Sequence, residues 1–133
     1  MRSFPLQVVT ADGMVFDGQA ESISVRAAGG DMSVQAGHCD YVTVLGMGQA
    51  RLIVDGKVRT AACIGGMLAV ADGKVRLVPT TFEWAEDIDR ERAKSALARA
   101  EEKLADASLS KEERRLAESA KRRAQVRLSI PQA

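Results

Sequence analysis

The segment PTTFEWAEDIDRERA, residues 79–93, separates two parts of the chain that differ sharply in composition. All 11 glycines lie in residues 1–82, and none lies in residues 83–133. The first part carries 7 basic and 7 acidic residues over 82 positions, and the second carries 12 basic and 11 acidic residues over 51. Such a shift in glycine content and charge density marks a domain boundary. We expect one domain over residues 1–84 and a second over residues 85–133.

The first part has the pattern of short antiparallel strands joined by tight turns. Asp-Gly favours hairpin turns because both residues tolerate positive φ, and it occurs at Asp12-Gly13, Asp17-Gly18, Asp55-Gly56 and Asp72-Gly73. Runs of β-branched or alternating residues cover Leu6–Val9, Glu21–Arg26, Gln49–Val54, Lys57–Cys63, Met67–Ala71 and Val75–Val78. Ile23 and Val25 alternate with serines, so we expect them to face a core and the serines to face away. These features predict a sandwich or a flattened barrel. Repeated Asp-Gly could also indicate calcium loops, but the carboxylate-rich EF-hand pattern is missing.

The second part has the spacing of two antiparallel helices. Asp87 or Asp89 can cap the first helix, and Ser110 with Glu113 fits a capping box at the start of the second, which Pro131 ends. Two apolar stripes follow the helical period: Ala93, Leu97, Ala100 and Leu104, and then Leu116 or Ala117, Ala120, Ala124 and Leu128. Because many contact positions are alanine, the hairpin buries little area and is only marginally stable alone. The predicted fold class is α+β, an antiparallel β-sandwich followed by a two-helix hairpin.

Composition argues against several classes of protein. The net charge of +1 lacks the basic excess of a general nucleic-acid binder. No apolar run approaches the roughly 20 residues of a membrane span, and the N-terminus lacks the apolar stretch of a signal peptide. We therefore expect a soluble, cytoplasmic chain without direct membrane insertion. Cys39 and Cys63 form no disulfide framework, and we expect them to be buried or idle thiols.

Motifs of catalysis and metal binding are missing as well. The sequence has no phosphate-binding P-loop, and its single histidine excludes zinc sites built on two or three histidines. His38-Cys39-Asp40 resembles a nucleophile cluster, but consecutive residues of an extended chain point in different directions. A structural loop is the better interpretation, and we expect neither a catalytic residue nor a metal site.

Arginines of the second part form the one unusual constellation. Asp89, Arg92, Ala93 and Arg99 fall within about a third of a helix circumference, and Arg123 and Arg127 share a face of the second helix. Folding of the hairpin would bring the two groups together, where arginines could bind phosphate and a small alanine could leave room for a flat ring. On spacing alone, a solvated face with ordinary salt bridges is the better interpretation. The second helix also carries a basic stripe suited to an acidic protein surface: Arg114, Arg115, Lys121, Arg122, Arg123 and Arg127.

Taken together, these residues resemble the epsilon subunit of bacterial rotary (F-type) ATP synthases. The resemblance rests on Val9-Thr10-Ala11-Asp12-Gly13, Gly30-Asp31-Met32, Gly37-His38, Val42-Thr43-Val44-Leu45, Gly65-Gly66-Met67-Leu68 and Asp87-Ile88-Asp89-Arg90-Glu91-Arg92-Ala93. The last segment matches the I/L-D-x-x-R-A motif that starts the family's first C-terminal helix. Ala11, Ala36 and Asp40 depart from the family's usual residues, which puts only local loop shape in doubt.

The resemblance implies a ten-stranded sandwich and a non-catalytic place on the central stalk of a proton-translocating ATP synthase. The sandwich would bind the gamma subunit and the c-ring, with the loop at Gly30-Asp31-Met32 and the neighbourhood of His38 near these partners. The C-terminal helices would extend toward the alpha and beta subunits and inhibit ATP hydrolysis, and the basic second helix would meet an acidic segment of beta. The protein would lie at the cytoplasmic face of the bacterial plasma membrane, as a peripheral part of the complex.

Some members of the family bind ATP as a regulatory ligand between the sandwich and the folded hairpin. Carried over by resemblance, the ATP site consists of Glu83, Ile88, Asp89, Arg92, Ala93, Arg99, Arg123 and Arg127. ATP would hold the hairpin folded, and its loss would release the inhibitory form. Two other hypotheses are a stand-alone nucleotide-sensing module, which would not bind gamma, and an enzyme with Cys39 as nucleophile.

Overall fold

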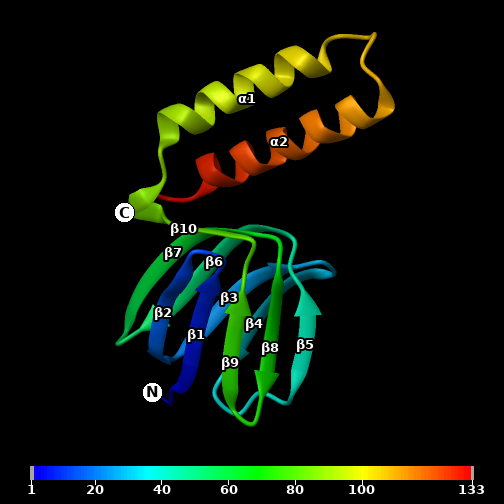
Figure 1. Cartoon of the computed structure of the whole chain (residues 1–133). Helices are drawn as coiled ribbons and strands as arrows, with labels where there is room; N and C mark the ends of the chain where they lie inside the picture. The colour runs from blue at the N-terminus through cyan, green and yellow to red at the C-terminus, as the bar shows by residue number, and fades with distance from the viewer. Residues whose placement is uncertain (1, 133) are drawn as a thin grey trace.

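The computed structural model describes residues 2–132 as a β-sandwich with a helical hairpin at one end (Figure 1). The strands are β1 (Phe4–Thr10), β2 (Gly13–Ala20), β3 (Ser22–Ala27), β4 (Gly30–Gln35), β5 (Tyr41–Val44), β6 (Met47–Val54), β7 (Lys57–Ile64), β8 (Met67–Ala71), β9 (Lys74–Val78) and β10 (Thr81–Trp84). A short 3-10 helix, η1 (Ala85–Asp87), leads into the helices α1 (Arg90–Leu104) and α2 (Lys111–Ser129). The predicted fold class is confirmed.

Two five-stranded sheets form the sandwich. Sheet A has the order β2-β1-β9-β8-β5, and sheet B has the order β10-β7-β6-β3-β4. Neighbouring strands are antiparallel except for β1 and β9, which run parallel with Leu6 opposite Val75. The expectation of antiparallel strands is wrong at this pair, because β1 and β9 are far apart in the chain and no hairpin turn sets their relative direction.

Six strands coincide with the runs expected from sequence, whereas β2, β4, β5 and β10 had no such run. Of these, β4 and β10 do alternate but are short of β-branched residues, and β5 exposes three of its four side chains. Gly30, Asp31 and Met32 begin β4, so the loop expected at these residues is a strand. Cross-strand pairing accounts for the difference: Arg26 of β3 forms an ion pair with Asp31 at 3.2 Å, and Val25 stands opposite Met32.

Three of the four Asp-Gly dipeptides lie at hairpin turns, as predicted. Asp55-Gly56 joins β6 to β7 and Asp72-Gly73 joins β8 to β9, with φ near +52° at each aspartate and positive φ at each glycine. Asp12 lies in the turn that leads from β1 to β2. Asp17-Gly18, in contrast, lies within β2 and pairs with Gln7 and Leu6. Gly18 leaves space there for the Phe16 ring, which a Cβ would approach to 3.5 Å.

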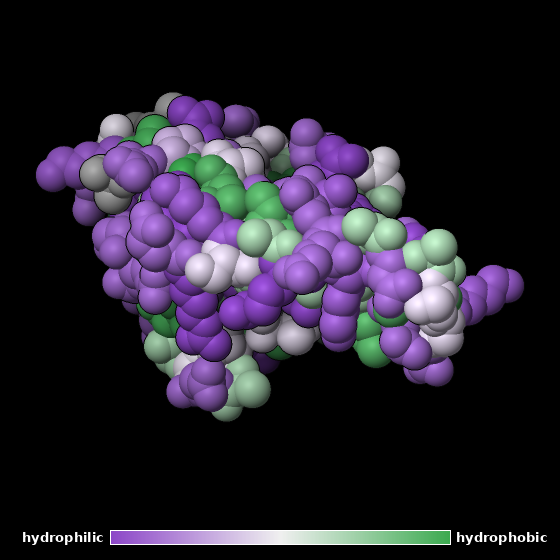
Figure 2. All heavy atoms as spheres, turned by 90° about the horizontal axis from the view of Figure 1, so that it is seen from above, coloured by the Kyte–Doolittle hydropathy of each residue, from purple (hydrophilic) through white to green (hydrophobic). Residues whose placement is uncertain are grey.

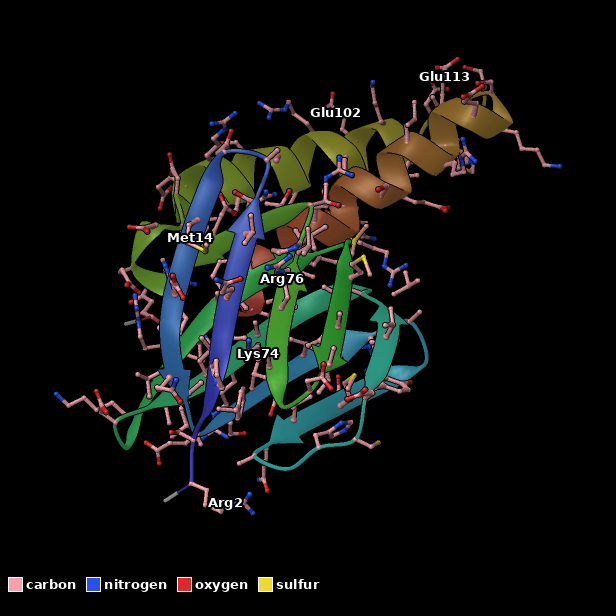
Figure 3. All side chains as sticks on the ribbon, turned by 60° about the horizontal axis from the view of Figure 1, so that its bottom comes forward. Arg2, Met14, Lys74, Arg76, Glu102 and Glu113 are labelled. Carbon is pink, nitrogen blue, oxygen red and sulfur yellow. The ribbon has the colours of Figure 1, made fainter. Side chains whose placement is uncertain are left out.

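Apolar side chains between the sheets form the core of the sandwich. Ile23 and Val25 face this core, and the Ser24 hydroxyl lies 2.7 Å from that of Ser33 on the opposite face, as the alternation predicted. Ser22 lies on the same face as Ser24 but is buried, because β3 is an interior strand of sheet B. On the outer face of sheet A, polar residues lie on β1 and β9, where Arg76 of β9 donates a hydrogen bond of 3.0 Å to Gln7 of β1 (Figure 3).

The two helices begin at the predicted caps. Asp89 accepts a hydrogen bond from the Arg92 backbone N–H, and Ser110 accepts one from that of Glu113 while donating to its carboxylate. The buried residues of the helices are Ala93, Ala100, Ala117 and Ala124. Seen from the hairpin end, the surface is mostly hydrophilic, with hydrophobic residues gathered near its middle (Figure 2). Alanine contacts of this kind contribute little stability per residue.

The hairpin rests on sheet B through α2, which packs against β6 and β7. A second, small hydrophobic cluster lies at this junction: Ala62, Ala85, Ile88 and Ile130, with Val126 packed against it. We call these five residues the junction cluster. Neither helix, within residues 2–132, has the length and the apolar composition that crossing a membrane requires.

Candidate functional site

The last strand of the sandwich turns one polar residue toward the hairpin. Phe82 and Trp84 pack into the core, so Glu83 between them points to the outer face of sheet B. Its partner in register is Ala62 of β7, which belongs to the junction cluster on that same face. Glu83 therefore stands beneath the helices without being part of either.

A cleft of about 460 Å³ lies where β10, α1 and α2 meet. It is lined by Glu83, Asp87, Asp89, Arg92, Ala93, Ala96, Arg99, Ala120, Arg123, Ala124 and Arg127. Seven of the eight residues assigned to the ATP site by resemblance are in this set. The eighth, Ile88, does not line the cleft and is buried in the junction cluster instead.

The two ends of the cleft are held by different contacts. Arg127 of α2 donates from Nε to a carboxylate oxygen of Glu83 at 2.5 Å, and both side chains are about one-third exposed or less. This pair joins the end of α2 to the sandwich. Arg123, one turn earlier, donates to the Ser119 hydroxyl at 2.7 Å. Asp89 uses a carboxylate oxygen to cap α1 by accepting from the backbone N–H of Arg92 at 3.0 Å.

Electrostatics favour an anionic occupant of the cleft. Four arginines face three carboxylates, of which Glu83 is already paired with Arg127. Within residues 2–132, Arg92 and Arg99 form no ion pair, so their guanidinium groups are available to a ligand. Guanidinium forks match the geometry of phosphate oxygens, and the N-terminus of α1 adds partial positive charge. This distribution of charge is of the kind that suits a phosphate-bearing molecule.

Small side chains give the cleft its depth. Ala93 and Ala96 of α1 face Ala120 and Ala124 of α2 along its lining. The sequence did not assign four of the lining residues to the site: Asp87, Ala96, Ala120 and Ala124. For the alanines an indication was available, because Ala96 lies four residues after Arg92 and Ala120 lies four residues before Ala124. The described lining contains neither histidine nor cysteine, and it offers no nucleophile paired with a base.

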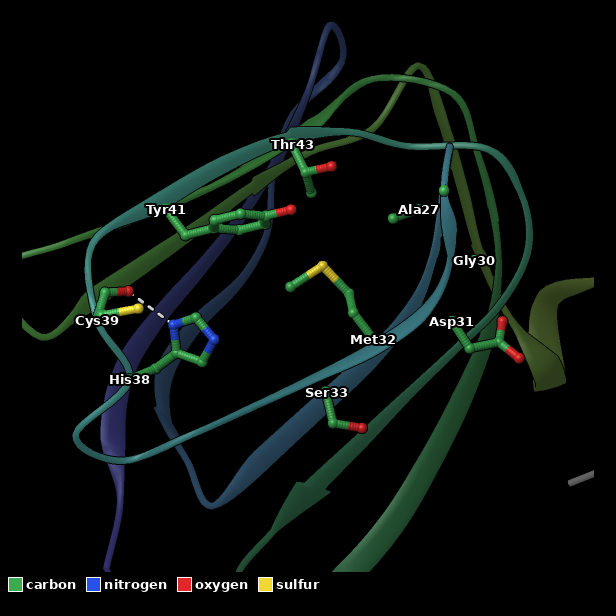
Figure 4. A pocket seen from close by; sticks show the side chains of 10 residues that line it. Ala27, Gly30, Asp31, Met32, Ser33, His38, Cys39, Tyr41 and Thr43 are labelled. Carbon is green, nitrogen blue, oxygen red and sulfur yellow. Dashed lines mark hydrogen bonds between the residues drawn. The ribbon is translucent and has the colours of Figure 1, made fainter.

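A second cavity of about 460 Å³ lies along an edge of the sandwich, between the edge strands β4 of sheet B and β5 of sheet A (Figure 4). Met32, His38, Cys39 and Tyr41 contribute to its lining. The His38 ring donates from Nδ1 to the backbone carbonyl of Cys39 at 2.6 Å and not to its thiol. His38 and Cys39 therefore form no nucleophile–base pair, in agreement with the interpretation of this segment as a loop. No cluster of metal-ligating side chains was found in the part of the chain that the structure describes.

Comparison with known proteins now decides the family. Residues 3–85 match the family described as "ATP synthase, Delta/Epsilon chain, beta-sandwich domain", and residues 86–131 match "ATP synthase, Delta/Epsilon chain, long alpha-helix domain". The chain belongs to the ATP synthase delta/epsilon family. This confirms the resemblance to epsilon subunits, and membership in the family makes the chain a non-catalytic subunit.

Relatives and solved structures agree with this assignment. The ATP synthase epsilon chain of Shouchella clausii is 35% identical over 130 residues, which cover 98% of this chain and 96% of the relative. That of Caldicellulosiruptor saccharolyticus is 42% identical over 104 residues, covering 78% and 76% of the two chains. A chain in the Euglena gracilis mitochondrial ATP synthase structure, described as OSCP/F1/c-ring in rotational state 1, has a TM-score of 0.82 and 26% identity, covering 92% and 78%.

Proposed function

We propose that this epsilon-family chain is a central-stalk subunit that couples rotation of gamma and the c-ring to the catalytic head and restrains ATP hydrolysis through its helices. The full-length match to an epsilon chain supports this proposal most strongly, because it includes both the sandwich and the hairpin. The structural likeness to a chain of an F1/c-ring assembly supports it further. The complex would be a proton-translocating synthase, with this subunit peripheral on the cytoplasmic face of the plasma membrane.

The sandwich offers the surfaces for gamma and the c-ring. The edge of the sandwich between β4 and β5 carries the cavity at His38 and the start of β4, the two segments that the family resemblance places near these partners. An apolar patch lies on the outer face of sheet A, where Val42 and Val44 of β5 stand beside Met67 of β8. Exposed apolar patches of this kind are typical of protein interfaces.

The helices offer the surface for alpha and beta. Arg115 and Arg122 of α2 are exposed, and Leu116 between them has 61% of its surface accessible. When α2 leaves the sandwich, this basic face would meet an acidic segment of the beta subunit. Inhibition would follow because the extended helices block movement of the catalytic subunits.

ATP in the cleft would keep the hairpin folded and the enzyme active. Arg92 and Arg99 would bind phosphate oxygens from α1, and Arg123 and Arg127 from α2, so the ligand joins both helices. A ligand at about 100 times its dissociation constant adds roughly 2.7 kcal/mol to the state that it binds. This suffices to bias a hairpin whose helices bury mainly alanine.

Reconstitution with gamma tests the proposed function. We expect the purified chain to form a stoichiometric complex with gamma on gel filtration, and we expect the assembled enzyme to hydrolyse ATP faster when the helical part is deleted. A chain that binds ATP but never binds gamma would be the stand-alone nucleotide sensor. Full retention of function after Cys39→Ala would remove the enzyme hypothesis built on that thiol.

A further inference from the structure

One large apolar side chain of the helical part is fully buried against the sandwich. Ile130 is 1% exposed and is the residue of the helical part that stands among the largest fully buried side chains of residues 2–132. The others lie in the core of the sandwich, and the buried residues within α1 and α2 are alanines. Burial of an isoleucine removes much more apolar surface from water than burial of an alanine. Apolar stabilisation of the docked hairpin is therefore concentrated at its last turn.

The surroundings of Ile130 come from three different elements. Ala62 projects from the outer face of β7, Ala85 belongs to η1, and Ile88 lies in the linker that leads to α1. The side chain of Ile130 thus contacts both the sandwich and the segment about which the hairpin would swing. Small residues at positions 62 and 85 provide the depression that receives it.

The fixed side of this junction is anchored independently of the hairpin. The Arg59 guanidinium of β7 lies 3.6 Å from the centroid of the Trp84 ring and pairs with Glu86 of η1 at 3.0 Å. These contacts hold η1 to the sandwich whether or not α2 is docked. Opening of the hairpin would therefore separate Ile130 and Val126 from Ala62, Ala85 and Ile88, and leave the latter group exposed.

We propose that Ile130 is a hydrophobic latch, whose insertion into the junction cluster sets the balance between docked and released hairpin even without nucleotide. The burial of Ile130 also explains why Ile88 does not line the cleft. Ile88 packs in the junction cluster with Ile130, whereas Asp89 and Arg92, one and four residues later, line the cleft. Arg127, which binds Glu83, lies one turn before Ile130, so release of the latch would also open the ion pair and the cleft. The regulatory consequence of the latch rests on the proposed function, whereas the latch itself does not.

Energy transfer within the full chain measures the latch directly. Trp84 is the single tryptophan and lies on the fixed side, and Gln125 is exposed on α2. An acceptor dye on Gln125→Cys would report their separation in a Cys39→Ser background, since we expect the buried Cys63 thiol to stay unlabelled. Removing most of a buried isoleucine should lower the docked-to-released ratio on the order of 30-fold. Leu116→Ala is the matched control, because Leu116 is 61% exposed and lies about four helical turns before Ile130, outside the junction cluster, so it should leave the ratio unchanged.

The measurement is made without nucleotide, gamma or other partner, so it stands apart from the test of the proposed function. Lower energy transfer in Ile130→Ala, with far-UV circular dichroism like that of the parent, would support the latch. Equal transfer in Ile130→Ala and the parent would overturn it, and so would equal losses in Ile130→Ala and Leu116→Ala. Should Ile130→Ala lose helix content, Ile130→Val decides: we expect a smaller shift, on the order of fivefold, and no shift would overturn the proposal.

Discussion

Two adjacent arginines of α2 provide a sharp test of the nucleotide cleft. Arg123 lines the cleft, whereas Arg122 is exposed outside it. A charge-assisted hydrogen bond from arginine to phosphate contributes about 1.5–3 kcal/mol. Arg123 already donates to the Ser119 hydroxyl at 2.7 Å, and giving up a bond of that kind offsets about 0.5–1.5 kcal/mol. The net contribution to ATP binding is about 1–2 kcal/mol, so Arg123→Ala should raise the Kd about 5- to 30-fold.

Calorimetric titration of the full chain with ATP at fixed ionic strength measures this difference. Arg122→Ala removes the same charge from the neighbouring position, so both variants lose the same long-range attraction for a polyanion. We expect less than about a twofold change in Kd for Arg122→Ala. Equal weakening in the two variants would mean that α2 attracts ATP by its charge alone, and no weakening in Arg123→Ala would place the ligand elsewhere.

Three further predictions concern stability and reactivity. Gly66→Ala should destabilise the sandwich by more than about 2 kcal/mol in a urea titration, because φ is +96° and a Cβ would overlap the backbone at the end of β9. In the same titration Gly56→Ala should lose only about 1 kcal/mol, because φ is positive there but the space around a Cβ is open. Ser110→Ala removes the capping box of α2 and should lower the stability of the hairpin by about 1 kcal/mol in thermal melts of helical circular dichroism. Burial raises the pKa of the Cys63 thiol to about 12, so iodoacetamide at pH 8 should modify the exposed Cys39 and leave Cys63 unmodified, as mass spectrometry of the native protein would show.

Local chemistry determined the parts of the fold that sequence predicted well. Asp55-Gly56 and Asp72-Gly73 form turns because each residue takes positive φ where the strands reverse. The helix caps at Asp89 and Ser110 followed from side chains that satisfy backbone N–H groups of their own first turn. Such features depend on neighbours within a few residues, which the sequence displays directly.

Features set by distant parts of the chain could not be predicted in the same way. Asp17-Gly18 lies in β2 because pairing with β1 and packing of Phe16 outweigh the turn preference. Helical spacing grouped Arg92 with Arg99, but Glu83 entered the predicted site by family resemblance alone. Glu83 belongs to β10, and it lines the cleft only because α2 docks on the sandwich beside it. Ile88 was assigned to the ATP site on the same basis, and the structure buries it against Ile130 instead.

Titration of the unmodified full-length chain with ATP tests the central claim most directly. We expect calorimetry to show saturable heat with one ATP per chain. The titration is run at two temperatures, because the binding enthalpy can vanish at one of them although ATP binds. Absence of heat at both temperatures would contradict the claim that the cleft between β10, α1 and α2 is a nucleotide site.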